Sequence, residues 1–214
     1  MIREIDEKLI SPAALMTSSD MAKLGCRQCQ GCSDCCRDRA DMITLDTYDI
    51  RLLKSNLNLS FEGLLNQGLI TLAVVDGVVL PCLSVKPTAS TSAGRPDSLP
   101  EECVFLGSDS RCLIHTFRPG ICRMFPLARI YHEDGSFSYF LQEGECSHST
   151  GVKIRISKWL GYPNIREYEH SVRIYHDALT DLRRQLKNNL PHEEQVAMQR
   201  SFLDDWFVKE KPGL

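Results

Sequence analysis

The hydrophobic pattern of the chain begins with a helical repeat in residues 43–57. One face of this predicted helix carries the apolar residues Ile50, Leu53 and Leu57. Thr44 is placed to cap the helix, and the carboxylates of Asp46 and Asp49 favour its positively polarised start. A second, shorter helix is expected over residues 60–68.

The pattern then changes to one typical of β-hairpins. Residues 69–83 hold two β-branched runs on either side of an Asp-Gly pair, which predicts a hairpin with Cys82 at the end of its second strand. Further short hairpins are expected at residues 102–115 and 127–142. Between the first two, residues 84–101 are rich in Ser, Pro, Thr and Ala, and we expect an exposed, flexible loop there.

The last third of the chain contains no cysteine and is expected to be helical. Its first helix has an apolar seam formed by Ile165, Tyr168, Val172, Tyr175, Leu179, Leu182 and Leu186. After Pro191, a second helix carries the apolar residues Val196, Phe202, Leu203, Trp206 and Phe207. We expect a helical hairpin whose seam packs on the rest of the protein, with a partner-binding seam as the alternative.

These elements predict an α+β fold. Short hairpins and short helices are expected to surround a cysteine-ligated metal centre in a domain of residues 1–161. The C-terminal helical hairpin, residues 162–214, is expected to pack on that domain.

Composition narrows the functional classes. The chain has 214 residues, 43% of them hydrophobic and 25% charged, with a net charge of −3, so no basic footprint for nucleic acid is expected. The start lacks the apolar core of a signal peptide, and the longest apolar stretch, residues 69–80, is too short to cross a bilayer. These features predict a cytoplasmic protein without a membrane segment. Thiols stay reduced in that compartment, where dense cysteine patterns indicate metal or redox chemistry.

The cysteines are the strongest chemical signal. The chain has 10 of them, and the stretch CRQCQGCSDCCRD at residues 26–38 is the densest part. One ligand set with bacterial ferredoxin spacing is Cys26, Cys29, Cys32 and Cys36. Arg37 stands where that motif has proline, and a second copy of the run is missing. The alternative set is Cys29, Cys32, Cys35 and Cys36, completed by cysteines further along the chain.

The distant cysteines are single. They are Cys82, Cys103, Cys112, Cys122 and Cys146. The hairpin expected at residues 102–115 would bring Cys103 close to Cys112. Pro119 fits the first turn of a helix that would carry Cys122, and a helix start lowers a thiol pKa. Soft thiolate ligands select zinc, copper(I) or iron–sulfur clusters.

The blocks CQGCSDCC, ECVFL, RCLIH and RPGICRMFP occur in this order. Together they resemble the CxxCxxCC family of YkgJ type, a zinc- or iron-chelating domain, from about Cys29 to Pro126 and on toward Trp159. The resemblance implies metal ligation by Cys29, Cys32, Cys35, Cys36, Cys103, Cys112 and Cys122. It also singles out Arg118, Pro119, Arg123 and Pro126. Cys26 lies outside the signature, and Cys82 and Cys146 look like features of a longer branch.

The resemblance implies metal binding more directly than a reaction. We expect an iron–sulfur cluster of the 4Fe–4S type, with zinc as the alternative, because all-thiolate ligation fits both. Relatives described as iron–sulfur oxidoreductases and a distant flagellin lysine N-methylase suggest a redox or methyl-transfer role, but no glycine-rich S-adenosylmethionine loop is evident. Arg118 and Arg123 are expected to act as outer-shell groups around the centre, or to hold an anionic substrate. Whether the protein is an enzyme, and whether it has a redox or protein partner, stays open at this point.

Overall fold

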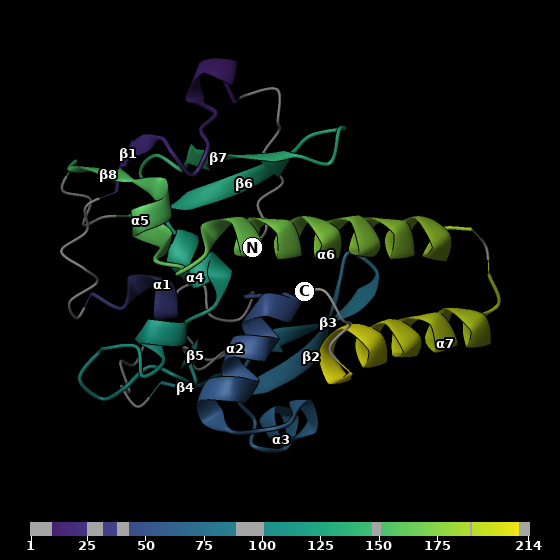
Figure 1. Ribbon diagram of the computed structural model, residues 1–214. Helices are drawn as coiled ribbons and strands as arrows, with labels where there is room; N and C mark the ends of the chain where they lie inside the picture. The colour runs from purple at the N-terminus through teal and green to yellow at the C-terminus, as the bar shows by residue number, and fades with distance from the viewer. Residues whose placement is uncertain are drawn as a thin grey trace, which may run out of the picture.

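The computed structural model describes residues 10–24, 32–37, 43–88, 101–146, 151–188 and 190–209 (Figure 1). Its helices are α1 (Asp34–Arg37), α2 (Thr47–Leu57), α3 (Phe61–Asn66), α4 (Gly120–Met124), α5 (Ile156–Leu160), α6 (Ile165–Leu186) and α7 (His192–Leu203). A π-helical segment, Asp204–Val208, continues α7. The helices combine with short antiparallel strand pairs and a helical C-terminal region, so the predicted α+β class is confirmed.

The described strands pair two by two. The pairs are β1 (Met21–Lys23) with β8 (Lys153–Arg155), β2 (Ile70–Val75) with β3 (Val78–Leu83), β4 (Val85–Pro87) with β5 (Glu101–Cys103), and β6 (Leu127–Tyr131) with β7 (Phe137–Leu141). The predicted β2–β3 hairpin turns at Asp76 and Gly77, whose φ angles of 49° and 80° suit a tight hairpin turn. The hairpin predicted at residues 127–142 is confirmed as β6–β7.

The predicted cap of the first long helix was wrong. Asp46, not Thr44, is the N-cap of α2: its Oδ1 accepts the Asp49 N–H at 2.9 Å, and Asp49 Oδ2 accepts the Asp46 N–H at 3.3 Å. This reciprocal pair is a capping box. Thr44 lies too early because its backbone is extended and bridges Cys82 of β3.

The predicted loop and second hairpin also need correction. Residues 85–87 form β4, which pairs with β5, so the loop predicted at residues 84–101 begins with a strand. The partner of β5 is β4, and the described segment after the turn has an isolated bridge between Leu106 and Cys112 in place of the predicted strand pair. Residues 89–100 of the predicted loop lie outside the described residues.

Helix α6 is shared between two hydrophobic cores. Its first half contributes Tyr168 and Val172 to a core with Leu127 and Tyr139 of the β6–β7 hairpin. Its second half contributes residues 175–182 to a core with the β2–β3 hairpin, α2 and the C-terminal segment. Figure 1 shows α6 crossing the molecule between the two hairpins.

The C-terminal seam packs inward, as predicted. Phe202, Trp206 and Phe207 are buried, and the ring of Phe207 stacks on Phe61 of α3 with centroids 5.8 Å apart. Val196 is the exception to the predicted apolar set, since it is 42% exposed. None of the described helices is long and apolar enough to cross a membrane.

Candidate metal centre

The structure describes the cysteines from Cys32 onward, and those with a free thiol include Cys32, Cys35, Cys36, Cys82, Cys103, Cys112 and Cys122. Cys26 and Cys29, two of the predicted ligands, lie outside the described residues. The thiols of Cys35, Cys36, Cys103, Cys112 and Cys122 interact electrostatically with one another. We call these five residues the thiol cluster. They come from three segments of the chain, the first of which lies more than sixty residues before the other two.

Arg37 holds the first of these segments in place. Its Nε lies 3.4 Å from Glu102 Oε2 on β5, next to Cys103, and its Nη2 donates to Ser110 Oγ at 3.4 Å, close to Cys112. Helix α1, which carries Cys35 and Cys36, therefore packs against β5. The sequence indicated Arg37 only as a departure from a ferredoxin motif, because Glu102 and Ser110 are more than sixty residues away.

The second segment brings Cys103 and Cys112 together, as the sequence predicted. Leu106 N–H donates to Cys103 O at 2.9 Å, and Leu113 N–H donates to Phe105 O at 2.9 Å, which closes the turn between the two cysteines. Burial raises the pKa of both thiols, and each thiol disfavours ionisation of its neighbours. These hydrogen bonds bring the two thiols into one cluster without a full strand ladder.

The third segment is α4, which carries Cys122. Burial raises the pKa of Cys122 well above its ordinary value of 9.0, with smaller contributions from Cys35 and Cys103. The expected lowering at a helix start is therefore wrong. The helix has only five residues, so its dipole is small beside the cost of burying a charge among other thiols.

Cys35 and Cys36 are adjacent and coupled. The Cys36 thiol donates a hydrogen bond to the Cys35 sulfur, and this bond, together with a smaller contribution from Arg118, lowers the pKa of Cys35 to about 7 despite burial. The same hydrogen bond, together with burial, raises the pKa of Cys36 above its ordinary value. In the metal-free state, Cys35 is therefore the member of this pair that ionises first.

The two candidate outer-shell arginines differ in their contacts. Arg118 interacts electrostatically with Cys35 and Cys112 and lowers the pKa of both. It also contacts His115 Nε2. Arg123 is 8% exposed and donates to three backbone carbonyls: Arg118 at 2.9 Å, Leu160 at 3.3 Å, and Thr116. Arg118 thus faces the thiols, whereas the described contacts of Arg123 fasten α4 to its neighbours.

The remaining described cysteines are Cys82, Cys32 and Cys146. Cys82 is 2% exposed in β3, burial alone raises its pKa, and it interacts electrostatically with Tyr175 of α6. Cys32 and Cys146 are partly buried; Cys32 precedes α1, and Cys146 follows β7. Among the predicted ligands, Cys82 therefore has the surroundings of a core residue.

The donor chemistry of the cluster fits a thiolate-bound metal or iron–sulfur cluster, because its donors are soft sulfur atoms. Within the described residues, however, no group of three or more His, Cys, Asp or Glu side chains is arranged to hold a metal ion.

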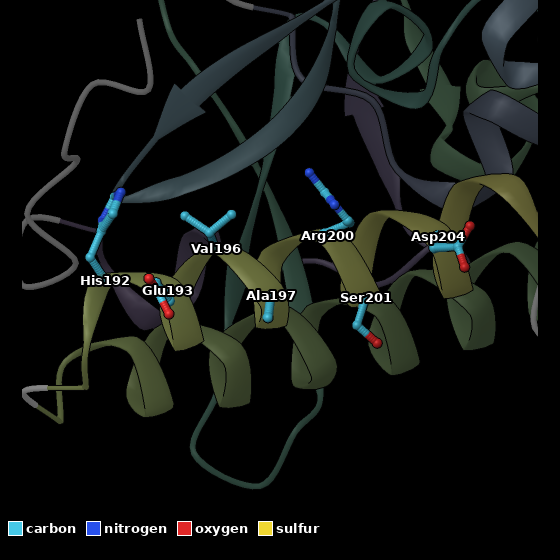
Figure 2. Close-up of a pocket in the computed structure, with 7 residues that line it drawn as sticks. All are labelled: His192, Glu193, Val196, Ala197, Arg200, Ser201 and Asp204. Atoms are coloured by element: carbon cyan, nitrogen blue, oxygen red, sulfur yellow. The ribbon is translucent and has the colours of Figure 1, made fainter.

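A surface pocket lies elsewhere on the molecule. Its described lining comes from α7 and the residue after it: His192, Glu193, Val196, Ala197, Arg200, Ser201 and Asp204 (Figure 2). Figure 2 shows Val196 and Arg200 pointing to the same side of α7. The described lining contains no cysteine, so the thiol cluster remains the candidate site.

An α+β scaffold that gathers free thiols from distant segments defines a cysteine-cluster protein. Residues 28–147 match the family model CxxCxxCC, described as "Putative zinc- or iron-chelating domain". The match covers more than half of the chain, so the protein belongs to this family and the predicted membership is confirmed. Membership supports metal binding in general terms. Searches of curated proteins and of solved structures find no significant match.

Proposed function

We propose that the protein binds an iron–sulfur cluster of the 4Fe–4S type through cysteine thiolates. The proposed ligands come from the thiol cluster together with Cys29 and Cys32. In this proposal the site is completed when the metal binds, because ligand sites and metal commonly form together. Cys26 and Cys146 are kept as further candidates, and Cys82 is assigned to the core.

The observation that carries this proposal is the mutual interaction of five thiols from three segments. Crowding thiols is unfavourable once they ionise, since each thiolate opposes ionisation of the next. A metal or cluster offsets that repulsion. Arg118 adds positive charge beside Cys35 and Cys112, which suits an anionic all-thiolate centre.

We further propose that the centre serves a redox or methyl-transfer-related reaction in the cytoplasm, with a redox or protein partner. A bound cluster would supply reversible one-electron transfer. The chain itself positions the thiolates and buries them, and Arg118 balances their charge. Soft donor atoms and partial burial support this part of the proposal.

Zinc is the second candidate, because the thiols also belong to a hydrophobic core. Cys103 is part of that core, and Cys36, Cys112 and Cys122 pack against it. A zinc ion there would hold α1, β5 and α4 together as a structural staple, without catalysis. The protein would then act as an interaction module.

Metal and acid-labile sulfide analysis of the full chain purified without oxygen separates the two candidates. The iron–sulfur proposal expects brown protein, iron and sulfide in comparable amounts, and a paramagnetic signal after one-electron reduction. A colourless, redox-silent protein with stoichiometric zinc supports the structural alternative. Protein that takes up neither iron nor zinc after reconstitution would contradict both.

A further inference from the structure

A buried carboxylate connects the thiol cluster to a distant helix. Asp49 of α2 is 2% exposed, and its Oδ1 accepts the backbone N–H of Gly120 at 2.7 Å, across 71 residues of sequence. Gly120 is the first residue of α4, two positions before Cys122. We call this hydrogen bond the Asp49 latch.

The latch supplies a hydrogen-bond acceptor that the residues next to α4 do not provide. The first N–H groups of a helix have no partner within the helix and are usually satisfied by the side chain of the N-cap residue. The N-cap of α4 is Pro119, which provides no such side chain. Asp49 therefore acts as the cap from another element.

Both partners of the latch are fixed by their surroundings. The second carboxylate oxygen of Asp49 accepts the Asp46 N–H within the α2 capping box, which orients the side chain. A Cβ on Gly120 would overlap the hydroxyl of Tyr168, so a glycine allows this close approach. A helix of five residues cannot hold its own position, so these contacts set where Cys122 lies.

We propose that Asp49 is a positioning residue for the metal centre: by holding the Gly120 N–H, it places Cys122 within the thiol cluster. The inference rests on the proposed thiolate ligation. Asp49 acts through α4 and does not touch the metal. Groups that orient ligands in this way typically change metal affinity by about 10- to 100-fold when they are removed.

Anaerobic titration of the metal-free full chain with Co²⁺ tests the proposal. Thiolate-to-cobalt charge-transfer absorption reports sulfur ligation, and the visible ligand-field bands report geometry. Asp49→Leu, of similar bulk but without an acceptor, is expected to weaken Co²⁺ binding by about 10-fold or more and to reduce charge-transfer intensity per bound ion. Asp49→Asn keeps one oxygen acceptor for the two N–H groups that Asp49 serves, and it is expected to bind Co²⁺ more tightly than Asp49→Leu but less tightly than wild type.

The matched control is Leu64→Ala on α3, a fully buried residue whose helix packs on α2, β2 and the C-terminal segment. It should lower fold stability by about 2–5 kcal/mol while leaving the cobalt spectrum unchanged. Asp49→Leu with wild-type affinity and spectrum would overturn the inference, and so would Asp49→Asn as weak as Asp49→Leu. No charge-transfer band in the wild type would instead overturn the proposed function.

The wild type provides an independent test should Asp49→Leu fail to fold. Because coupling is reciprocal, metal bound at Cys122 must stabilise the latch as much as the latch stabilises the metal. Zn²⁺ is therefore expected to slow hydrogen exchange at the Gly120 amide by about 10-fold, relative to an amide in the β6–β7 hairpin. Equal protection with and without Zn²⁺, in protein shown to hold the ion, would reject the latch.

Discussion

At the scale of single residues, a thiol acquires its role from its neighbours. Cys82 is buried and Cys122 is partly buried, and both have raised pKa values. Burial is the only cause of the raised pKa of Cys82. The pKa of Cys122 is raised by burial and also by Cys35, Cys103 and Cys112. We therefore expect Cys82 to contribute to core packing and Cys122 to bind the metal.

Paired substitutions distinguish these roles. Cys122→Ser is expected to lower metal affinity by more than about 10-fold and to reduce thermal stability of the metal-loaded protein with it, because metal-binding and folding free energies are shared. Cys82→Ala should cost about 1 kcal/mol of fold stability and leave metal content unchanged. Metal analysis and thermal unfolding measure both effects. Equal metal loss in the two variants would contradict the assignment.

The buried carboxylate of Asp49 predicts a pH dependence. Burial, and then the nearby Asp46, raises the pKa of Asp49 well above its ordinary value of 3.8. The folded state thus keeps this proton to higher pH than the unfolded state. Its stabilising contribution is complete below pH 3.8 and is lost as the pH rises through the folded pKa.

Asp49→Asn removes this titration. The free energy of unfolding of the variant, relative to wild type, should therefore increase as the pH rises above 3.8 and level off above the pKa of Asp49 in the folded state. Urea unfolding of both metal-free proteins across this range measures the difference. A difference that does not vary with pH would mean that Asp49 titrates alike in the folded and unfolded states.

At the scale of elements, α4 is a short helix held by its neighbours. Asp49 caps it from α2, Arg123 ties it to Leu160 at the end of α5, and Tyr168 of α6 closes over Gly120. A helix this short would not be stable in isolation. Its position, and so that of Cys122, depends on three other helices.

Gly120→Ala is expected to destabilise the protein by about 1–3 kcal/mol, because the new Cβ would overlap the Tyr168 hydroxyl. Tyr168→Phe in the same chain should recover part of this loss. Tyr162→Phe should recover less, because its hydroxyl would lie 3.3 Å from that Cβ. Chemical unfolding of the single and double variants measures the coupling. If Gly120→Ala lowered the free energy of unfolding equally with Tyr168 and with Phe at that position, the overlap with the Tyr168 hydroxyl would be excluded as the cause.

At the scale of the whole molecule, α6 takes part in both hydrophobic cores. The C-terminal segment enters the same core as the β2–β3 hairpin and α2. The thiol cluster adjoins that core through Cys103. The predicted division at residues 161 and 162 stays a prediction, and cooperative unfolding can test it.

Phe207→Ala removes a ring that is 0% exposed and stacked on Phe61. It is expected to cost about 3–5 kcal/mol and to lower a single unfolding transition followed by helix circular dichroism and tryptophan fluorescence. If the transitions separated, with the N-terminal part unaffected, the C-terminal helices would form an independent unit.

Patterns within a few residues allowed several elements to be predicted. The Asp-Gly turns, the helical seam of α6 and the CxxCxxCC motif depend on backbone preferences or spacing along a short segment. The cap of α2 was misplaced by two residues because Thr44 and Asp46 are both good caps by type. Thr44 is excluded as the cap by its strand bridge to Cys82, which the sequence does not show.

The sequence by itself therefore determined the kinds of elements, the family and the sulfur chemistry. Tertiary structure decided which thiols become neighbours, that Cys82 is separate, and that Arg37 and Asp49 hold the segments carrying Cys35 and Cys122. The physical reason is range. Turns and helices depend on nearby residues, whereas a thiol pKa, an ion pair or a cap from another helix depends on groups brought together only by folding.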